Sequence, residues 1–217
     1  MEKVLIFIIM AIPVFSLSGQ GWYDEESWDT IFFETPSPYI QIDTSGNNLW
    51  QRAIPVKIEF DSAWSGDYVM ITDSSGFYPV NNHSWFELIL GSHNIRTYPY
   101  SIYIQFRHKF DTDTIRDGCY LTVSWDRGIT WSNIIRDKNY SEETPRYENF
   151  NLYSEADTLF NGEYGFSGSS DGWKTTWFGW HYYPLKKQMS LSESDTMLLR
   201  FNFISDDIYD EREGWMI

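Results

Sequence analysis

The sequence predicts an all-β protein, an antiparallel sandwich of two sheets. Short runs rich in β-branched and aromatic residues recur along the chain, and clusters of Gly, Pro, Asn and Asp separate them. No long segment repeats with the 3.6-residue period of a helix. Short strands with turns between them favour antiparallel sheets over a parallel α/β sheet. Aromatic residues make up 19% of the chain and include 11 Trp, so a large apolar core can form.

Residues 1–19 read as a signal peptide. Lys3 precedes an apolar run from Val4 to Phe15, and Ser16-Leu17-Ser18 supplies small residues for a cleavage site. The run is too short to span a bilayer, and Pro13 interrupts it. No cysteine follows the cleavage region, so a lipid anchor is not indicated. We expect a secreted or cell-surface protein whose mature chain has no membrane span.

Residues 20–217 read as one β-sandwich domain, because no linker, low-complexity run or internal repeat divides them. The formal net charge of -15 argues against nucleic acid or an anionic membrane as a partner. The same charge suits calcium or a cationic partner, and it also suits a merely solvated acidic surface.

Six strands are predicted from their residue content. The turn clusters at residues 73–76 and 168–172 lie between such runs. In chain order the predicted strands are Ile54 to Phe60, Asp67 to Thr72, Trp85 to Leu90, Ser101 to Phe110, Cys119 to Trp125 and Met197 to Ile204.

The stretch from Asp117 to Trp131 carries the most specific local pattern. Cys119, Leu121 and Val123 alternate with polar or amphipathic residues, which is typical of a half-buried strand. The alternation places the lone Cys119 on the apolar face, which favours a buried thiol over a reactive one and leaves no internal disulfide.

The turn that follows matches an Asp-box, S-x-D-x-G-x-T-W, at Ser124, Asp126, Gly128, Thr130 and Trp131. Asp126 can accept backbone N–H groups, Gly128 can take a positive φ, and Trp131 can pack back over the hairpin. A structural hairpin accounts for every one of these residues, while a direct ligand role is the alternative.

Three further stretches resemble a known family. They are Leu49 to Ala63, Ile102 to Asp111 leading into the Asp-box, and Leu198 to Asp207 leading to Gly214-Trp215-Met216-Ile217. Together they resemble MAM-type modules and the bacterial jelly-roll modules associated with immune-inhibitor-A-like metallopeptidases. The resemblance covers about residues 48 to 217. It implies an antiparallel jelly-roll sandwich, concanavalin-A-like or galactose-binding-like, that is extracellular and non-catalytic.

Two departures from the family pattern stand out. The Gly-Trp-x-Ile motif ordinarily continues into a pair of Asp residues and a last strand, so the sequence reads as truncated in that strand after Ile217. MAM modules also carry paired cysteines, which this chain lacks, so the bacterial modules are the more similar group.

No catalytic motif is present in the sequence. There is no H-E-x-x-H helix, no G-x-S-x-G elbow and no Gly-rich phosphate loop, and His83, His93, His108 and His181 form no i, i+4 pair. The Asp-box suggests a sialidase, but a propeller needs several blades and repeated boxes. We therefore expect no enzyme activity, and no cofactor other than calcium.

Calcium is the candidate metal, because carboxylates crowd two predicted loops and hard cations prefer oxygen ligands. Asp111, Asp113 and Asp117 lie between two strands, and Asp206 and Asp207 lie in the last loop. The spacing does not fit an EF-hand, and solvated loop carboxylates are the alternative interpretation.

Carbohydrate is the second candidate ligand, because Trp173, Trp177, Trp180 and Tyr182 crowd one segment. In a strand, Trp173 and Trp177 would share one side while Trp180 and Tyr182 share the other. One side must then face the core.

The predicted function is a non-catalytic extracellular adhesion or binding module of a larger secreted or cell-surface protein. Its partner would be an extracellular protein or polysaccharide. The alternative is an accessory domain of a secreted metallopeptidase or glycan-degrading enzyme whose catalytic part lies outside this chain.

Overall fold

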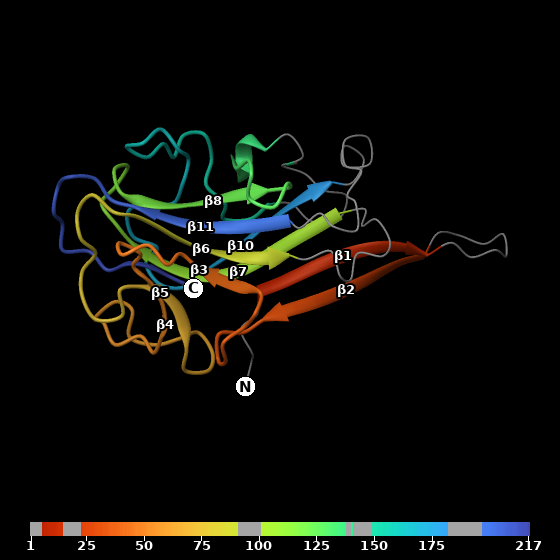
Figure 1. Ribbon diagram of the computed structural model, residues 1–217, viewed down its shortest axis with the longest axis horizontal. Coiled ribbons are helices and arrows are strands. Elements are labelled where there is room, and N and C mark those ends of the chain that lie inside the picture. Colours follow the sequence, from red (N-terminus) through yellow and green to blue (C-terminus); the bar gives the residue numbers. More distant parts are fainter. Residues whose placement is uncertain (1–5, 15–22, 91–100, 138–139, 141–148, 182–196) are drawn as a thin grey trace.

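The computed structural model describes residues 6–14, 23–90, 101–137, 140, 149–181 and 197–217. Two antiparallel sheets stack face to face, which confirms the predicted all-β sandwich (Figure 1). In this described part there is no α-helix, only a single 3-10 turn at Ile134–Arg136.

The larger sheet has seven strands and is organised around β7, Ser101–Asp111. β10, Lys174–His181, pairs with one edge of β7. β12 and β1 follow one another along the other edge, pairing with residues 109–111 and 102–105 of β7. The sheet order is β2-β1-β7-β12-β5-β4, with β2 Tyr23–Ile31, β1 Ile6–Val14, β12 Gly214–Met216, β5 Val69–Thr72 and β4 Trp50–Ala53.

The smaller sheet has five strands with β11, Met197–Ile204, at its centre. Phe201 lies opposite both Phe86 and Leu121, so apolar residues of three strands share the inward face. The order is β3-β6-β11-β8-β9, with β3 Ile40–Ile42, β6 His83–Leu90, β8 Gly118–Ser124 and β9 Ser132–Asn133.

Trp215 lies at the centre of the core between the two sheets and is fully buried. Its ring centroid lies 5.5 Å from those of Trp50 and Phe201, in tilted or edge-on geometry. The indole Nε1 donates to Nδ1 of His108 at 3.0 Å, and Nε2 of His108 bonds the Thr176 hydroxyl at 2.8 Å. Because Nδ1 accepts, the ring proton is on Nε2, and His108 is a neutral core residue.

Five of the six predicted strands are confirmed, and Ile54 to Phe60 is wrong. β4 ends at Ala53, and residues 54–60 form a loop whose Ile54, Val56 and Ile58 are exposed. Pro55 has no N–H to donate to a ladder. The backbone N–H groups of residues 58–60 instead bond the side chain of Glu213, which no local pattern could reveal.

β8 is buried on both faces, so the expected half-buried strand is wrong in that detail. Tyr120 and Thr122, on the outward side, are covered by neighbouring side chains, and Asn202 donates to the Thr122 hydroxyl at 3.1 Å. The predicted burial of the Cys119 thiol is confirmed, and burial raises its pKa well above the ordinary value.

The Asp-box forms a closed hydrogen-bond network. The Asp126 carboxylate accepts from the Thr130 N–H at 2.8 Å and the Thr130 hydroxyl at 2.6 Å, while Gly128 N–H donates to the Ser124 hydroxyl at 2.7 Å. The hydroxyl and N–H bonds from Thr130 hold the pKa of Asp126 below its ordinary value. Gly128 has a φ of 86°, and Trp131 Nε1 closes the turn on the Gly128 carbonyl. Every residue of the motif therefore has a structural role.

The N-terminal strands form a hairpin at the edge of the larger sheet, and Figure 1 shows it reaching outward from the sandwich. Only Phe7 to Met10 of β1 pair with β7. β1 overlaps the predicted signal peptide, residues 1–19. Strand pairing does not address removal on export, so the signal peptide stays a prediction.

The neutral state of His108 predicts a pH dependence of stability. Burial lowers its pKa to about 3, against about 6.5 in an unfolded chain. Between these values the unfolded state binds a proton that the folded state does not, so the unfolding free energy rises with pH from about 3 to 6.5 and then levels. The slope contributed is at most about 1.4 kcal/mol per pH unit.

Urea unfolding at pH 4.5, 5.5, 6.5 and 7.5 measures this slope. His108→Asn keeps an acceptor for Trp215 and should flatten the profile, whereas His83→Asn, on an exposed side chain, should not. Equal slopes in both variants would contradict the assignment.

Candidate functional site

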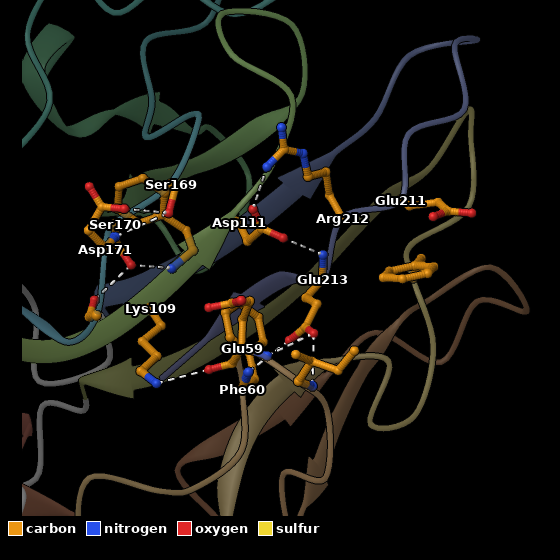
Figure 2. A pocket seen from close by; sticks show the side chains of 14 residues that line it. Glu59, Phe60, Lys109, Asp111, Ser169, Ser170, Asp171, Glu211, Arg212 and Glu213 are labelled. Carbon is orange, nitrogen blue, oxygen red and sulfur yellow. Dashed lines mark hydrogen bonds and ion pairs between the residues drawn. The ribbon is translucent and has the colours of Figure 1, made fainter.

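A cavity of about 470 Å³ opens at the end of β7. Four segments and Phe77 line it: residues 58–60, 109–111, 169–172 and 211–213 (Figure 2). Carboxylates and cations both face it, while Phe77, Phe110 and Ile58 add apolar surface. A cavity of this size with mixed walls is of the kind that takes a small ligand or one end of a larger one.

Glu213 fixes one wall of the cavity. Its side chain accepts the N–H groups of Ile58, Glu59 and Phe60 at 3.0, 2.9 and 2.8 Å, although Glu213 is only 3% exposed. Three converging backbone donors satisfy the buried carboxylate and hold the 58–60 loop in place.

Asp111 fixes the adjacent wall. Its carboxylate accepts from Arg212 Nη1 at 3.0 Å and from the Glu213 N–H at 3.1 Å. Hydrogen bonds to Asp111 and Asp210 raise the pKa of Arg212. Both buried carboxylates of the cavity are therefore committed to structural bonds.

Lys57 lies behind the Glu213 wall. Its ammonium donates to the carbonyls of Thr72 and Glu213 at 2.9 and 2.7 Å. Burial lowers the pKa of Lys57 to about 8. Because its bonds go to backbone carbonyls, this lysine ties the loops together.

Lys109 joins the cavity to an aromatic surface on the outer face of β7. Its ammonium donates to the Glu59 carbonyl at 2.9 Å and lies 3.7 Å from the Asp61 carboxylate. It also lies 5.8 Å from the centre of the Trp173 ring. Trp173 directly follows Gly172 of the cavity wall, so the aromatic surface and the cavity are continuous.

We call this surface the outer ridge, comprising Trp64, Trp173, Arg107 and Lys109. The Trp64 and Trp173 rings meet edge to face at 6.2 Å, and the Arg107 guanidinium lies 4.0 Å from the Trp64 ring. Trp64 is 39% exposed. Trp173 is half-buried against the small apolar cluster of Phe60, Val69, Ile71 and Met216.

The predicted carbohydrate residues are divided between the core and the outer face. Thr176, Phe178 and Trp180 are buried along β10, while Trp173 and Trp177 are half-buried on its outward side, as strand parity predicts. Trp180 is 0% exposed and packs edge-on against Trp125 at 5.4 Å, so it is a core residue and not part of a binding surface. Tyr182 lies outside the described residues.

Four of the five predicted calcium residues form ion pairs or hydrogen bonds within the chain. Asp111 accepts a hydrogen bond from Arg212 and, within the described residues, shares no bonding partner with Asp117 or Asp206. Asp117 accepts from the Tyr78 hydroxyl at 2.8 Å and from the Asp206 N–H at 2.7 Å, and burial raises its pKa.

Arg116 is the cation beside the Asp113 and Asp206 carboxylates. It forms an ion pair with Asp206 and lies 3.8 Å from Asp113, while Asp207 is exposed. Over the residues that the structure describes, no three His, Cys, Asp or Glu side chains converge to hold a metal ion.

The titratable groups with shifted pKa in the core are in their neutral, unreactive forms. Burial raises the pKa of Cys119, Tyr78 and Tyr153 and lowers that of His108. The side chains of His93 and His181 lie outside the described part. These four groups belong to the core, whereas Arg212 and Lys57, whose pKa values are also shifted, line or adjoin the cavity and are held by bonds within the chain.

Comparison with protein-family models, with curated proteins and with solved structures finds no match to this chain. The resemblance to MAM-like modules therefore stays a prediction. None of the described helical residues forms a segment long and apolar enough to cross a membrane.

Sequence reasoning missed Trp64 and Arg107. Trp64 lies in the 54–66 loop, where no periodic pattern marks it. Arg107 and Lys109 alternate with buried residues of β7. Two cations on one face of a strand are unusual in so acidic a chain, and this pattern could have indicated a site for an anionic ligand.

Replacing Glu213 should loosen the cavity wall. Glu213→Gln leaves an amide N–H₂ facing backbone donors, so we expect a loss of about 2 kcal/mol in unfolding free energy. Urea unfolding measures it, and Glu211→Gln, on an exposed side chain of the same segment, should change stability little. Equal stability of the two variants would show that the 58–60 loop does not depend on this carboxylate.

We predict that Arg116 takes the place of a calcium ion at the acidic loops. We expect the same melting temperature in chelator and in millimolar calcium, because the guanidinium already pairs with Asp206 and lies 3.8 Å from Asp113. Arg116→Gln should lower the melting temperature by several degrees, at about 3 °C per kcal/mol for this size. Arg127→Gln, in an exposed turn, is the matched control. A calcium-dependent rise in the wild type would contradict the assignment.

Proposed function

We propose that this protein is a non-catalytic extracellular binding module that holds a glycan on the outer ridge and in the adjoining cavity. The observation that carries the proposal is the meeting of Trp64 and Trp173 with a polar cavity of about 470 Å³. Aromatic faces cover the apolar faces of sugar rings, and nearby polar groups bond the hydroxyls.

The cavity rim supplies such polar groups. Ser169, Asp171 and Glu211 are exposed at its edge, and Lys109 reaches it from the ridge. Sugar hydroxyls both donate and accept hydrogen bonds, so a rim with both kinds of partner suits them.

The bonding of the buried carboxylates supports a non-catalytic role. Glycoside hydrolysis needs two carboxyl groups free to act on the scissile bond. Asp111 and Glu213 instead bond Arg212 and backbone N–H groups. Such a surface suits a separate module and also an accessory domain beside a secreted enzyme.

Trp64→Ala should weaken glycan binding without unfolding the protein, because Trp64 is partly exposed and lies outside the main core. The measurement is the dissociation constant on a panel of immobilised neutral and acidic polysaccharides. We expect at least a tenfold loss of affinity for any polymer that the wild type binds, corresponding to about 1.4 kcal/mol of ring contact.

Phe160→Ala is the matched control, since Phe160 is another exposed aromatic ring and is absent from the ridge. Near-UV circular dichroism checks that both variants fold. The proposal fails if the wild type binds no polysaccharide on the panel, or if the two variants bind equally well.

A further inference from the structure

We infer that the outer ridge selects acidic glycans, and that Arg107 binds their carboxylate groups. The inference rests on the proposed function and specifies its ligand class. It depends on how Arg107 is bonded, on what surrounds it and on the charge of the whole chain.

Arg107 differs from four other arginines of the described ranges by having no ion pair; Arg52 also has none but donates to the carbonyls of Phe33 and Glu34, and Arg127 is exposed in a turn. Arg116, Arg136, Arg200 and Arg212 each form an ion pair with a carboxylate. Within the described ranges, the only recorded interaction of the Arg107 guanidinium is with the Trp64 ring at 4.0 Å. A half-buried cation on a sheet face, stacked but without an anionic partner, is a group available to an incoming anion.

The stack on Trp64 leaves Arg107 suited to this task. A guanidinium that lies over a ring keeps its N–H edge free, and that edge fits a carboxylate through two parallel hydrogen bonds. The ring restrains the side chain, so less rotamer freedom is lost on binding. The exposed Trp64 and the half-buried Trp173 remain beside it for sugar rings.

Further outward-facing residues of β7 and β10 continue the outer ridge as a row along the two strands. Arg107 lies opposite Thr175, and Gln105 lies opposite Trp177, on the outward side of β7 and β10. Trp173 and Trp177 are four residues apart, roughly 13 Å along a strand. A polymer with several sugar units can therefore contact the whole row, whereas a single sugar cannot.

The negative net charge of the chain means that binding of an acidic glycan needs a specific local site. With a formal charge of -15, the protein repels polyanions in general. Binding of an acidic polymer must then come from a local site that combines cations with shape. An acidic peptide offers carboxylates but no sugar faces for Trp64 and Trp173, so the ridge favours a uronate-type polysaccharide.

A matched pair of polymers tests the inference. The dissociation constant is measured on immobilised polygalacturonate and on the same polymer with its carboxylates methyl-esterified. The wild type should bind the acidic form at least tenfold more tightly, and the difference should shrink at high salt. Arg107→Gln should lose at least tenfold on the acidic form and little on the ester, since only the acidic form offers a charged group to bond the guanidinium.

Two further variants sharpen the result. Arg107→Lys keeps the charge without the planar edge and should recover only part of the affinity. Arg127→Gln removes an exposed arginine of the Asp-box turn and should bind as the wild type does.

The outcomes separate the two proposals. Equal binding of the acidic and esterified polymers, with Arg107→Gln unchanged, would overturn the inference while the glycan module stands. Equally tight binding of polyglutamate would show that charge alone is recognised and would also overturn it. Failure to bind any neutral or acidic polysaccharide would overturn the proposed function itself.

Discussion

The burial of Trp215 is the constraint on which both sheets depend. Its indole fills the space between them, contacts Trp50 and Phe201, and satisfies its N–H on His108. The backbone before it must pass close to β5, because a side chain at Gly214, where φ is 95°, would collide with the Thr72 hydroxyl. That hydroxyl accepts from the Trp215 N–H at 2.8 Å. The glycine and the tryptophan of the motif thus act as one unit.

The segment that leads into Trp215 also builds the candidate site. As β12 pairs with residues 109–111 of β7, Arg212 and Glu213 arrive beside Asp111 and the 58–60 loop. Core packing therefore positions the cavity, and the buried carboxylates of Asp111 and Glu213 hold its wall segments in place through hydrogen bonds. The same strand β7 turns its alternate residues outward, which places Arg107 and Lys109 on the ridge. One strand serves the core on one face and the proposed ligand surface on the other.

The sequence pattern predicted those parts of the fold that depend on residues close together in the chain. The positions of β6, β8 and β11, the Asp-box turn and the division of Trp173 from Trp180 all follow from residue type at short spacing. What it missed depends on partners remote in the chain. The 54–60 loop is held by Glu213, and Asp206 is neutralised by Arg116. The linear sequence cannot show that Asp206 lies beside Arg116, because this ion pair forms only when the chain folds.

The distribution of cations connects the electrostatics of the fold to its proposed function. The chain has 16 Lys and Arg against 31 Asp and Glu, and several arginines pair with buried carboxylates such as Asp111, Asp206 and Glu87. Within the described residues, Arg107 forms no such ion pair. An acidic ligand approaching a protein of this charge is repelled over most of the surface, so the orientation that brings it to Arg107 and Trp64 is favoured before contact. The acidic surface would then contribute to specificity by excluding every other mode of approach.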